Sequence, residues 1–197
     1  MLYFLGRSIS YIFVKFFCGF KVTGRANIPK KGGFILASNH ASYLDPLVLG
    51  AASSRRMEYF AKEELFKNKL FAKILYAVGA FPVKRNKMDL FSIKEAIRRL
   101  KEGRALVMFP EGTRSTDGQI HDAQEGVGFL ASKAEVPVIQ AYISGTDKVL
   151  PKNAKSLKLN KIRVYFGEKI DFERRQAYAD VSNMVIQRIR QLACNLS

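Results

Sequence analysis

The chain is poor in the residues that build disulfide frameworks and multi-histidine metal centres. Its 197 residues include two cysteines, Cys18 and Cys194, and two histidines, His40 and His121. Two such distant cysteines give neither a disulfide framework nor a metal-ligand spacing, which suits a reducing compartment. The hydrophobic content of 48% and the charged content of 25% are those of a globular protein, so general disorder is excluded. The length fits a single domain.

Acidic residues are scarce relative to basic ones. The chain has 33 Lys and Arg but 17 Asp and Glu, which gives a net charge of +16. Such an excess indicates an anionic partner, which is a nucleic acid, a phosphorylated metabolite or an anionic membrane surface. The alternative is a solvated basic face that only keeps the protein soluble. We expect no nucleic-acid partner, because the chain has no helix-turn-helix, zinc finger or other binding signature.

No charge-free apolar run reaches the ~18 residues that a membrane-spanning helix needs. Residues 1–20 come nearest, but Arg7 and Lys15 interrupt them, and charges inside the segment also argue against a signal peptide. As an amphipathic helix, the segment is expected to lie in a membrane interface, and the alternative is packing on the protein's own core. Its apolar side would hold Leu2, Leu5, Ile9, Ile12, Phe13, Phe16 and Phe20, opposite Arg7, Ser8, Tyr11 and Lys15.

The rest of the chain alternates between short apolar runs and amphipathic segments. This alternation predicts an α/β fold, with a mostly parallel or mixed sheet flanked by helices. We expect residues 21–197 to form one domain behind the membrane-interface helix of residues 1–20. The expected strands are 34–38, 57–61, 81–84, 105–109, 136–143 and 162–166, and the expected helices are 46–52, 62–78 with a break near Asn68, 88–101, 123–134 and 181–193.

The first cluster of chemistry-bearing residues follows the predicted strand at 34–38. Ligands bind outside the carboxyl ends of strands in open α/β sheets, so the position favours a functional site. On one continuous helix His40 and Asp45 would point about 140° apart and could not pair. Asp45 and Pro46 instead suit the start of a helix, over which a loop carrying His40 can fold back. Asp45 then holds one imidazole nitrogen and leaves the other as a base. The alternative is an Asp45 that only caps and a His40 that only hydrogen-bonds.

Two further clusters combine cations with turns. Residues 79–85 read GAFPVKR, and residues 109–115 read FPEGTRS. A guanidinium binds phosphate bidentately, while a glycine lets the backbone approach a ligand and offer N–H groups to an oxyanion. Each cluster alone is ordinary turn chemistry. Together with His40 they predict a general base beside a cationic, phosphate-binding pocket.

In this order, the segments resemble the four sequence blocks of the glycerolipid acyltransferases, most closely the lysophosphatidate acyltransferase type. The blocks are His40-x4-Asp45, Gly79 to Arg85, residues 109–114 and residues 136–138, and the resemblance covers about residues 22–145. Family members often carry a second proline in the fourth block, where this chain has Gln140. Because that block is thought to shape the acyl or acceptor pocket, the departure concerns substrate identity more than chemistry.

The resemblance implies a reaction and roles for individual residues. His40 removes a proton from the acceptor hydroxyl, whose oxygen attacks an acyl thioester, while Asp45 orients His40. A thioester is already activated, so no covalent acyl-enzyme is required, and the chain has no Gly-x-Ser-x-Gly elbow. Arg85 and Arg114 hold the acceptor's phosphate, assisted by Lys84. Glu111, Gly112 and Thr113 position the acceptor or the oxyanion.

The resemblance also implies partners and a location. No metal and no cofactor is expected, and the co-substrate is acyl-CoA or acyl carrier protein. The acceptor is a membrane lipid, so we expect an enzyme of phospholipid biosynthesis that associates with an anionic membrane surface on the cytoplasmic face. Three alternatives remain: another lyso-lipid acceptor, which Gln140 keeps open, a nucleic-acid-binding protein suggested by charge alone, and an inactive membrane-binding scaffold. The scaffold is disfavoured by the presence of both His40 and Asp45. His121, in a polar stretch, is expected on a surface loop.

Overall fold

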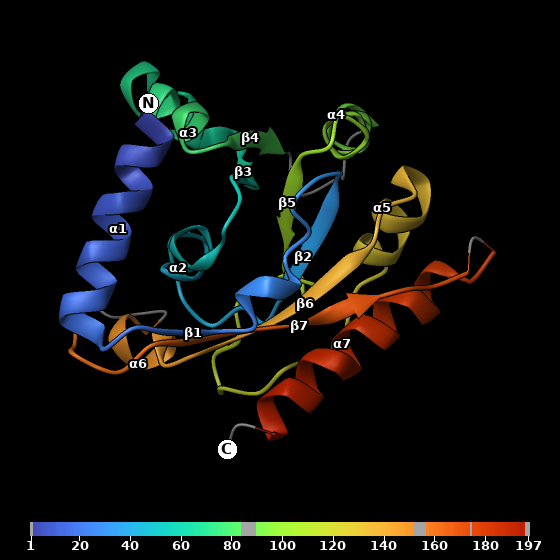
Figure 1. The fold of residues 1–197 in the computed structure, drawn as a ribbon. Helices are drawn as coiled ribbons and strands as arrows, with labels where there is room; N and C mark the ends of the chain where they lie inside the picture. The colour runs from blue at the N-terminus through green and yellow to red at the C-terminus, as the bar shows by residue number, and fades with distance from the viewer. Residues whose placement is uncertain (1, 84–89, 152–156, 174, 196–197) are drawn as a thin grey trace.

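One mixed β-sheet organises the computed structural model, which describes residues 2–83, 90–151, 157–173 and 175–195 (Figure 1). Its strand order is β1-β7-β6-β2-β5-β3-β4. Strands β6, β2, β5, β3 and β4 run parallel to one another, while β7 is antiparallel to β6 and parallel to β1. The strands are β1 (Lys21–Thr23), β2 (Phe34–Ser38), β3 (Met57–Lys62), β4 (Ala80–Val83), β5 (Ala105–Met108), β6 (Val138–Ser144) and β7 (Arg163–Ile170).

Helices cover both faces of the sheet, so the predicted α/β fold with a mixed sheet is confirmed. Helices α1 and α2 lie over one face, and α4, α5 and α7 lie over the other (Figure 1). The helices are α1 (Leu2–Cys18), α2 (Asp45–Ala52), α3 (Lys69–Ala77), α4 (Leu90–Lys101), α5 (Gly126–Ala134), α6 (Thr146–Val149) and α7 (Tyr178–Cys194), with 3₁₀ turns η1 (Arg25–Asn27) and η2 (Glu63–Phe66).

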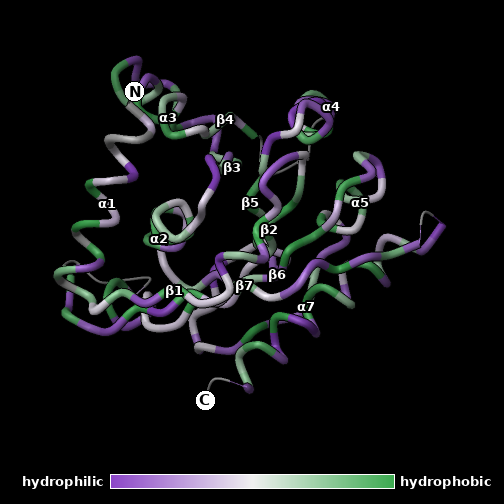
Figure 2. Tube along the Cα trace, viewed as in Figure 1, coloured by the Kyte–Doolittle hydropathy of each residue, from purple (hydrophilic) through white to green (hydrophobic). Residues whose placement is uncertain are grey.

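The sheet separates two hydrophobic cores. Strand β2 is buried along its whole length, and successive side chains point to opposite faces. Phe34 and Leu36 therefore enter the core under α1 and α2, while Ile35 and Ala37 enter the core under α4, α5 and α7. Figure 2 shows the same pattern, with β2 and β5 hydrophobic in the middle of the sheet. Burial on both faces explains why these strands read as continuous apolar runs.

The break predicted near Asn68 is present and has a local cause. Asn68 precedes α3, and its side-chain oxygen accepts hydrogen bonds from the backbone N–H groups of Leu70 (3.0 Å) and Phe71 (3.1 Å). This is an N-cap, which satisfies two donors that the first helical turn leaves free. One predicted helix therefore becomes the short turn η2 followed by α3.

Helix α1 packs on the body of the protein with one side only. Tyr3, Val14 and Cys18 are buried, and Arg7 donates to the backbone oxygen of Ser53 behind α2. The opposite side exposes apolar residues of the predicted interface face: Ile9 is 59%, Ile12 53% and Phe16 78% exposed. Of the other residues predicted on that face, Phe20 follows the helix and packs on the core, while the side chains of Leu2, Leu5 and Phe13 lie outside the description.

No helix in the described ranges is both long and apolar enough to cross a bilayer. Helix α1 nevertheless belongs to the folded unit, because Val14 and Cys18 are part of the core beneath it. The Cys18 carbonyl oxygen also accepts a hydrogen bond from the backbone N–H of Ile162, at 2.8 Å.

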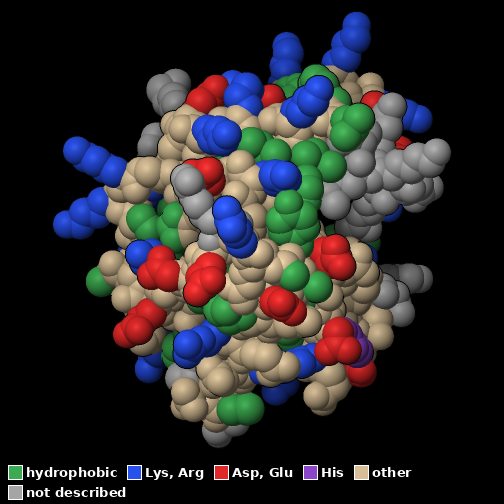
Figure 3. All heavy atoms as spheres, turned by 90° about the vertical axis from the view of Figure 1, so that its right-hand side faces the viewer, with side chains coloured by type: hydrophobic (Ala, Val, Ile, Leu, Met, Phe, Trp, Pro, Cys, Tyr) green, Lys and Arg blue, Asp and Glu red, His purple; other side chains and the backbone are tan. Residues whose placement is uncertain are grey.

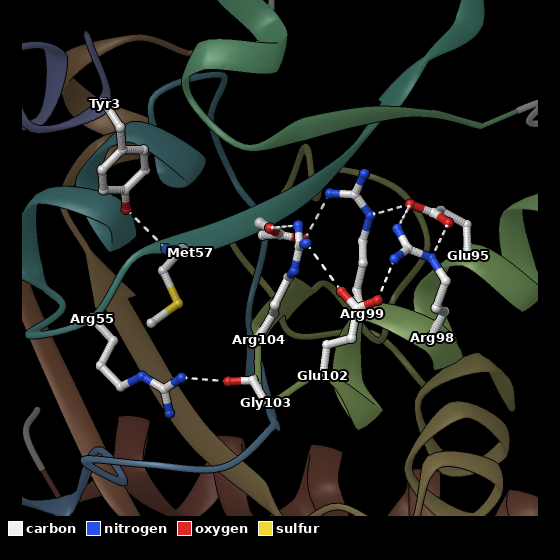
Figure 4. A network of polar contacts seen from close by, with 10 residues as sticks. Tyr3, Arg55, Met57, Glu95, Arg98, Arg99, Glu102, Gly103 and Arg104 are labelled. Atoms are coloured by element: carbon white, nitrogen blue, oxygen red, sulfur yellow. Dashed lines mark hydrogen bonds and ion pairs between the residues drawn. The ribbon is translucent and has the colours of Figure 1, made fainter. Parts of the chain in front are cut away.

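A polar network holds the amino-terminal edge of the sheet together (Figure 4). Buried Glu58, near the start of β3, pairs with Arg99 at 2.7 Å and Arg104 at 3.1 Å. Glu95 accepts from Arg98 and Arg99, and hydrogen bonding to Arg98 is the main cause that lowers the pKa of Glu95 to about 2. These ion pairs connect β3, α4 and the turn before β5, so this edge of the sheet has a structural role.

Candidate active site

His40 and Asp45 meet at the carboxyl edge of the sheet. Strand β2 ends at Ser38, and α2 begins at Asp45, one residue earlier than expected, with Leu44 rather than Asp45 as its N-cap. The predicted contact is present: His40 Nδ1 and Asp45 Oδ2 are 2.8 Å apart, and both side chains are largely buried. The loop folds back over the helix start, as the Asp-Pro pair indicated.

The carboxylate of Asp45 fixes the loop as well as the ring. Its Oδ2 also accepts hydrogen bonds from the backbone N–H groups of Ala41 (2.7 Å) and Ser42 (2.8 Å). A carboxylate accepts hydrogen bonds, so the His40 proton must lie on Nδ1 for this contact to form. Nε2 then carries the free lone pair, and in the described part of the chain it has no hydrogen-bond partner. This arrangement suits a general base.

The imidazole is held from the sides too. The His40 ring stacks on Phe109, with 3.9 Å between ring centroids and 15° between planes. The His40 N–H donates to Glu111 Oε1 at 3.0 Å, and its carbonyl oxygen accepts from the Ser115 N–H at 2.7 Å. The two sequence clusters, from the ends of neighbouring strands β2 and β5, are therefore joined into one site.

Glu111 links the His40 loop to the segment that carries His121. It is buried, and its second oxygen accepts from the His121 N–H at 3.0 Å. Burial raises the pKa of Glu111, opposed by the two backbone hydrogen bonds. Each carboxylate oxygen thus already accepts from the chain's own backbone. Glu111 therefore positions the His40 loop, and the acceptor or oxyanion contact that the resemblance implied stays a prediction.

Gly112 and Thr113 form the turn beyond Glu111. The Gly112 N–H donates to the carbonyl oxygen of Phe109 at 3.0 Å, and Gly112 has a positive φ of 70°. This is the left-handed region, in which a side chain is strained, so the turn needs glycine. Thr113 is exposed. Contacts of either residue with substrate stay predictions.

Arg114 lies against Tyr43 of the histidine loop. Its guanidinium lies 3.5 Å from the ring centroid of Tyr43, which belongs to the His40–Asp45 loop and is 63% exposed. Arg114 Nη1 is buried, and neither this atom nor the rest of the guanidinium pairs with a carboxylate among the described residues. A guanidinium that lies over an aromatic ring and pairs with no carboxylate among the described residues is suited to a phosphate.

Two positioning residues were missed by sequence reasoning. The Asn39 amide pairs with both backbone groups of Ile143 in β6: Nδ2 donates to the carbonyl oxygen (3.0 Å) and Oδ1 accepts from the N–H (2.8 Å). Ser42 Oγ donates to the carbonyl oxygen of Leu150 at 2.8 Å. Together they fasten both sides of the His40 loop to β6 and the segment after it. The only local signal was an amide directly before the histidine.

Comparison with known proteins decides the family. The family model described as Acyltransferase matches residues 19–144. The chain belongs to the acyltransferase family. It is 32% identical over 182 residues to the 1-acyl-sn-glycerol-3-phosphate acyltransferase of Bacillus subtilis, covering 88% of each chain. It is 30% identical to the enzyme of that name from Streptococcus pneumoniae, but spans 50% of that protein's length.

A solved acyltransferase has the same fold. The 1-acyl-sn-glycerophosphate acyltransferase PlsC of Thermotoga maritima superposes with a TM-score of 0.76 at 26% sequence identity. The match covers 94% of this chain and 79% of the other. The family match includes the His40–Asp45 loop, the 109–115 turn and β6, so it spans the described site.

Two predicted phosphate-binding residues of this acyltransferase follow β4 in the sequence. Arg85 and Lys84 lie outside the described residues, just beyond the end of β4, so their phosphate role stays a prediction. His121 is on the surface as predicted, with its side chain 51% exposed and Nε2 3.1 Å from Asp117 Oδ1.

Gln140 has a structural task in this acyltransferase. It is buried in β6, where the register with β7 shifts between Ile139 and Ala141. A Cβ placed on Gly167 of β7 would lie 2.2 Å from Gln140 Nε2, so the glycine makes room for the amide. In one of its two orientations the amide pairs with both backbone groups of Glu168. The residue therefore supports the irregularity between β6 and β7, and its influence on the acceptor stays a prediction.

Proposed function

We propose that this acyltransferase transfers a fatty acyl group from an acyl thioester to the free hydroxyl of lysophosphatidate, giving phosphatidate. The observation that carries the proposal is the free Nε2 of the Asp45-held His40 beside an Arg114 that has no carboxylate partner among the described residues. The names of the Bacillus subtilis and Thermotoga maritima relatives support the same acceptor. The acyl donor is acyl-CoA or acylated acyl carrier protein. Both donors are anionic, which suits a chain with a net charge of +16.

The reaction is a direct transfer. The acceptor hydroxyl gives its proton to His40 Nε2 while its oxygen attacks the thioester carbonyl carbon. The new C–O bond forms a tetrahedral intermediate, which collapses as the C–S bond breaks. The imidazolium, stabilised by Asp45, returns the proton to the departing thiolate. Arg114, with Arg85, holds the acceptor's phosphate so that its hydroxyl faces Nε2. The reaction needs no metal or cofactor.

The acceptor is tested by a panel of lyso-lipids. We expect purified protein in detergent to acylate lysophosphatidate at least tenfold faster than lysophosphatidylcholine or monoacylglycerol, because only lysophosphatidate offers a dianionic phosphate to arginine. Each acceptor is assayed with long-chain acyl-CoA and with acyl carrier protein that carries a long-chain acyl thioester, and the lipid product is identified by mass. Faster acylation of another lyso-lipid would keep the chemistry and refute the acceptor.

We also propose that the enzyme associates with the cytoplasmic face of the membrane, with α1 as one contact. The exposed side of α1 carries Ile9, Ile12 and Phe16, flanked by the exposed residues Ser8 and Lys15. Large apolar side chains with a neighbouring cation are typical of a helix lying in a bilayer interface. The same helix packs on the core with its other side, so its fold does not depend on lipid.

Substitution is a better test of α1 than truncation, because deleting the helix would uncover Val14, Cys18 and the core beneath. The variant Ile9→Ser/Ile12→Ser/Phe16→Ser should bind anionic vesicles at least tenfold more weakly, since each fully buried apolar side chain is worth about 1.5–3 kcal/mol. Vesicle flotation measures binding, and thermal unfolding checks the fold. Unchanged flotation of a folded variant would refute this contact.

A further inference from the structure

The crossover from β3 to β4 exposes an apolar surface, which we call the α3 surface: Leu65 of η2 and Leu70, Phe71, Ile74 and Tyr76 of α3. Leu70 is 73% exposed, and the other four are between 43% and 53% exposed. In the whole of α3 only Ala72 is buried. A helix of a soluble monomer normally buries its apolar side, and a concentrated exposed patch marks an interaction site.

The helix holds this surface in a defined geometry. The Asn68 cap accepts from the N–H groups of Leu70 and Phe71, the two residues that present side chains at the tip of α3. At the other end of α3, a Cβ on Gly6 of α1 would lie 3.9 Å from Val78 Cγ1. The α3 surface is therefore a folded, capped helix resting against α1, with which it shares one side of the molecule (Figure 1).

Lysines border the apolar residues. Lys62, Lys67, Lys69 and Lys73 are all exposed, and residues 62–77 contain four lysines against two glutamates. Within α3 itself, Lys69 and Lys73 are one turn apart and next to Leu70 and Ile74, and the helix has no acidic residue. The face on the other side of the sheet, which carries α4, α5 and α7, differs from the α3 surface. Figure 3 shows acidic and basic side chains both spread over that face.

The α3 surface also adjoins the candidate active site. Turn η2 begins at Glu63, directly after β3 ends at Lys62, so it lies at the carboxyl edge of the sheet. Strand β3 is the neighbour of β5, which leads into Glu111 and Arg114. A partner bound to η2 and α3 is thus placed beside the edge where His40 lies.

We propose that η2 and α3 dock on an anionic lipid bilayer and thereby turn the carboxyl edge of the sheet toward the membrane. The apolar residues enter the boundary between headgroups and acyl chains, and the lysines contact the anionic headgroups. A bilayer fits better than a protein partner, because α1, which exposes apolar residues of its own, lies on the same side of the molecule as α3 (Figure 1). This inference rests on the proposed function, in which the acceptor is a membrane lipid.

The test uses two variants of the full chain, Leu70→Ser/Phe71→Ser/Ile74→Ser and Lys69→Glu/Lys73→Glu. The control is Lys101→Glu/Arg188→Glu, which changes the net charge equally at exposed positions of α4 and α7. We expect each α3 variant to bind vesicles of anionic phospholipid at least tenfold more weakly than wild type, and the control to bind within twofold of it. The lysine variant should lose nothing on zwitterionic vesicles, where the headgroups carry no net charge. Thermal unfolding confirms that the variants fold.

Activity separates this inference from the proposed function. With lysophosphatidate in vesicles the α3 variants should form phosphatidate at least tenfold more slowly, and with lysophosphatidate dispersed in detergent they should equal wild type. If wild type forms no phosphatidate in either medium, the proposed function fails, while flotation still decides the docking. Flotation equal to wild type overturns the inference. The inference is also overturned if wild type is a dimer and the apolar variant is a monomer. A lysine variant that loses only its binding to acyl carrier protein would overturn it too.

Discussion

Replacing His40 by alanine should lower kcat by about 10²–10⁴-fold, which is the usual contribution of general base catalysis. The variant loses Nε2, the atom that we propose takes the acceptor's proton, but keeps the backbone contacts of residue 40 with Glu111 and Ser115. The acceptor KM should therefore change only a few fold. The measurement is steady-state formation of phosphatidate from lysophosphatidate dispersed in detergent.

The chain supplies its own control for this substitution. His121 is the other histidine, and its exposed side chain contacts Asp117 rather than the site. His121→Ala keeps the backbone N–H that donates to Glu111, so its kcat should stay within twofold of wild type. Equal losses in the two variants, or a His40→Ala variant with wild-type kcat, would remove His40 from the chemistry.

Replacing Arg114 by alanine should raise the acceptor KM about 10–100-fold, because hydrogen bonds to charged groups are worth about 1.5–3 kcal/mol. The guanidinium lies on Tyr43 with no carboxylate partner among the described residues, so its interaction is available to the acceptor's phosphate. Arg114→Lys should recover part of the loss, since an ammonium keeps the charge but not the planar fork or the stacking on Tyr43.

An acceptor without phosphate distinguishes this role from a structural one. Monoacylglycerol should react slowly with wild type and equally slowly with Arg114→Ala, because neither combination forms the phosphate contact. A general distortion of the site would slow both acceptors alike. An unchanged KM for lysophosphatidate would show that Arg114 does not bind the phosphate, and would leave Arg85 as the candidate.

Local sequence signals predicted the elements that position the site. The continuous apolar runs at 34–38 and 105–109 gave β2 and β5, because strands buried on both faces lack polar alternation. The Asp45-Pro46 pair gave the helix start and, from it, the contact between His40 and Asp45. These inferences succeeded because their causes lie within a few residues of the element they concern.

Contacts between distant segments gave no such signal. Strand β1 has three residues and pairs with β7, some 140 positions later, and no apolar run marked it. The Asn39 side chain hydrogen-bonds the backbone of Ile143, which is 104 positions away, and Glu111 accepts from the N–H of His40, which is 71 positions away. The periodicity of α1 did not separate the side that packs from the side that is exposed. Lys15 was expected opposite Phe16, but both are exposed, while Arg7 is half-buried and donates to the carbonyl oxygen of Ser53.

The most direct test of the account is acyl transfer by the purified protein from a long-chain acyl thioester to lysophosphatidate, beside His40→Ala. Thiol release and the mass of the lipid product are followed in the same reaction. The account predicts one thiol released for each phosphatidate formed by wild type, and loss of both in the folded variant. Phosphatidate formed equally by both proteins, or by neither with any thioester, would contradict it.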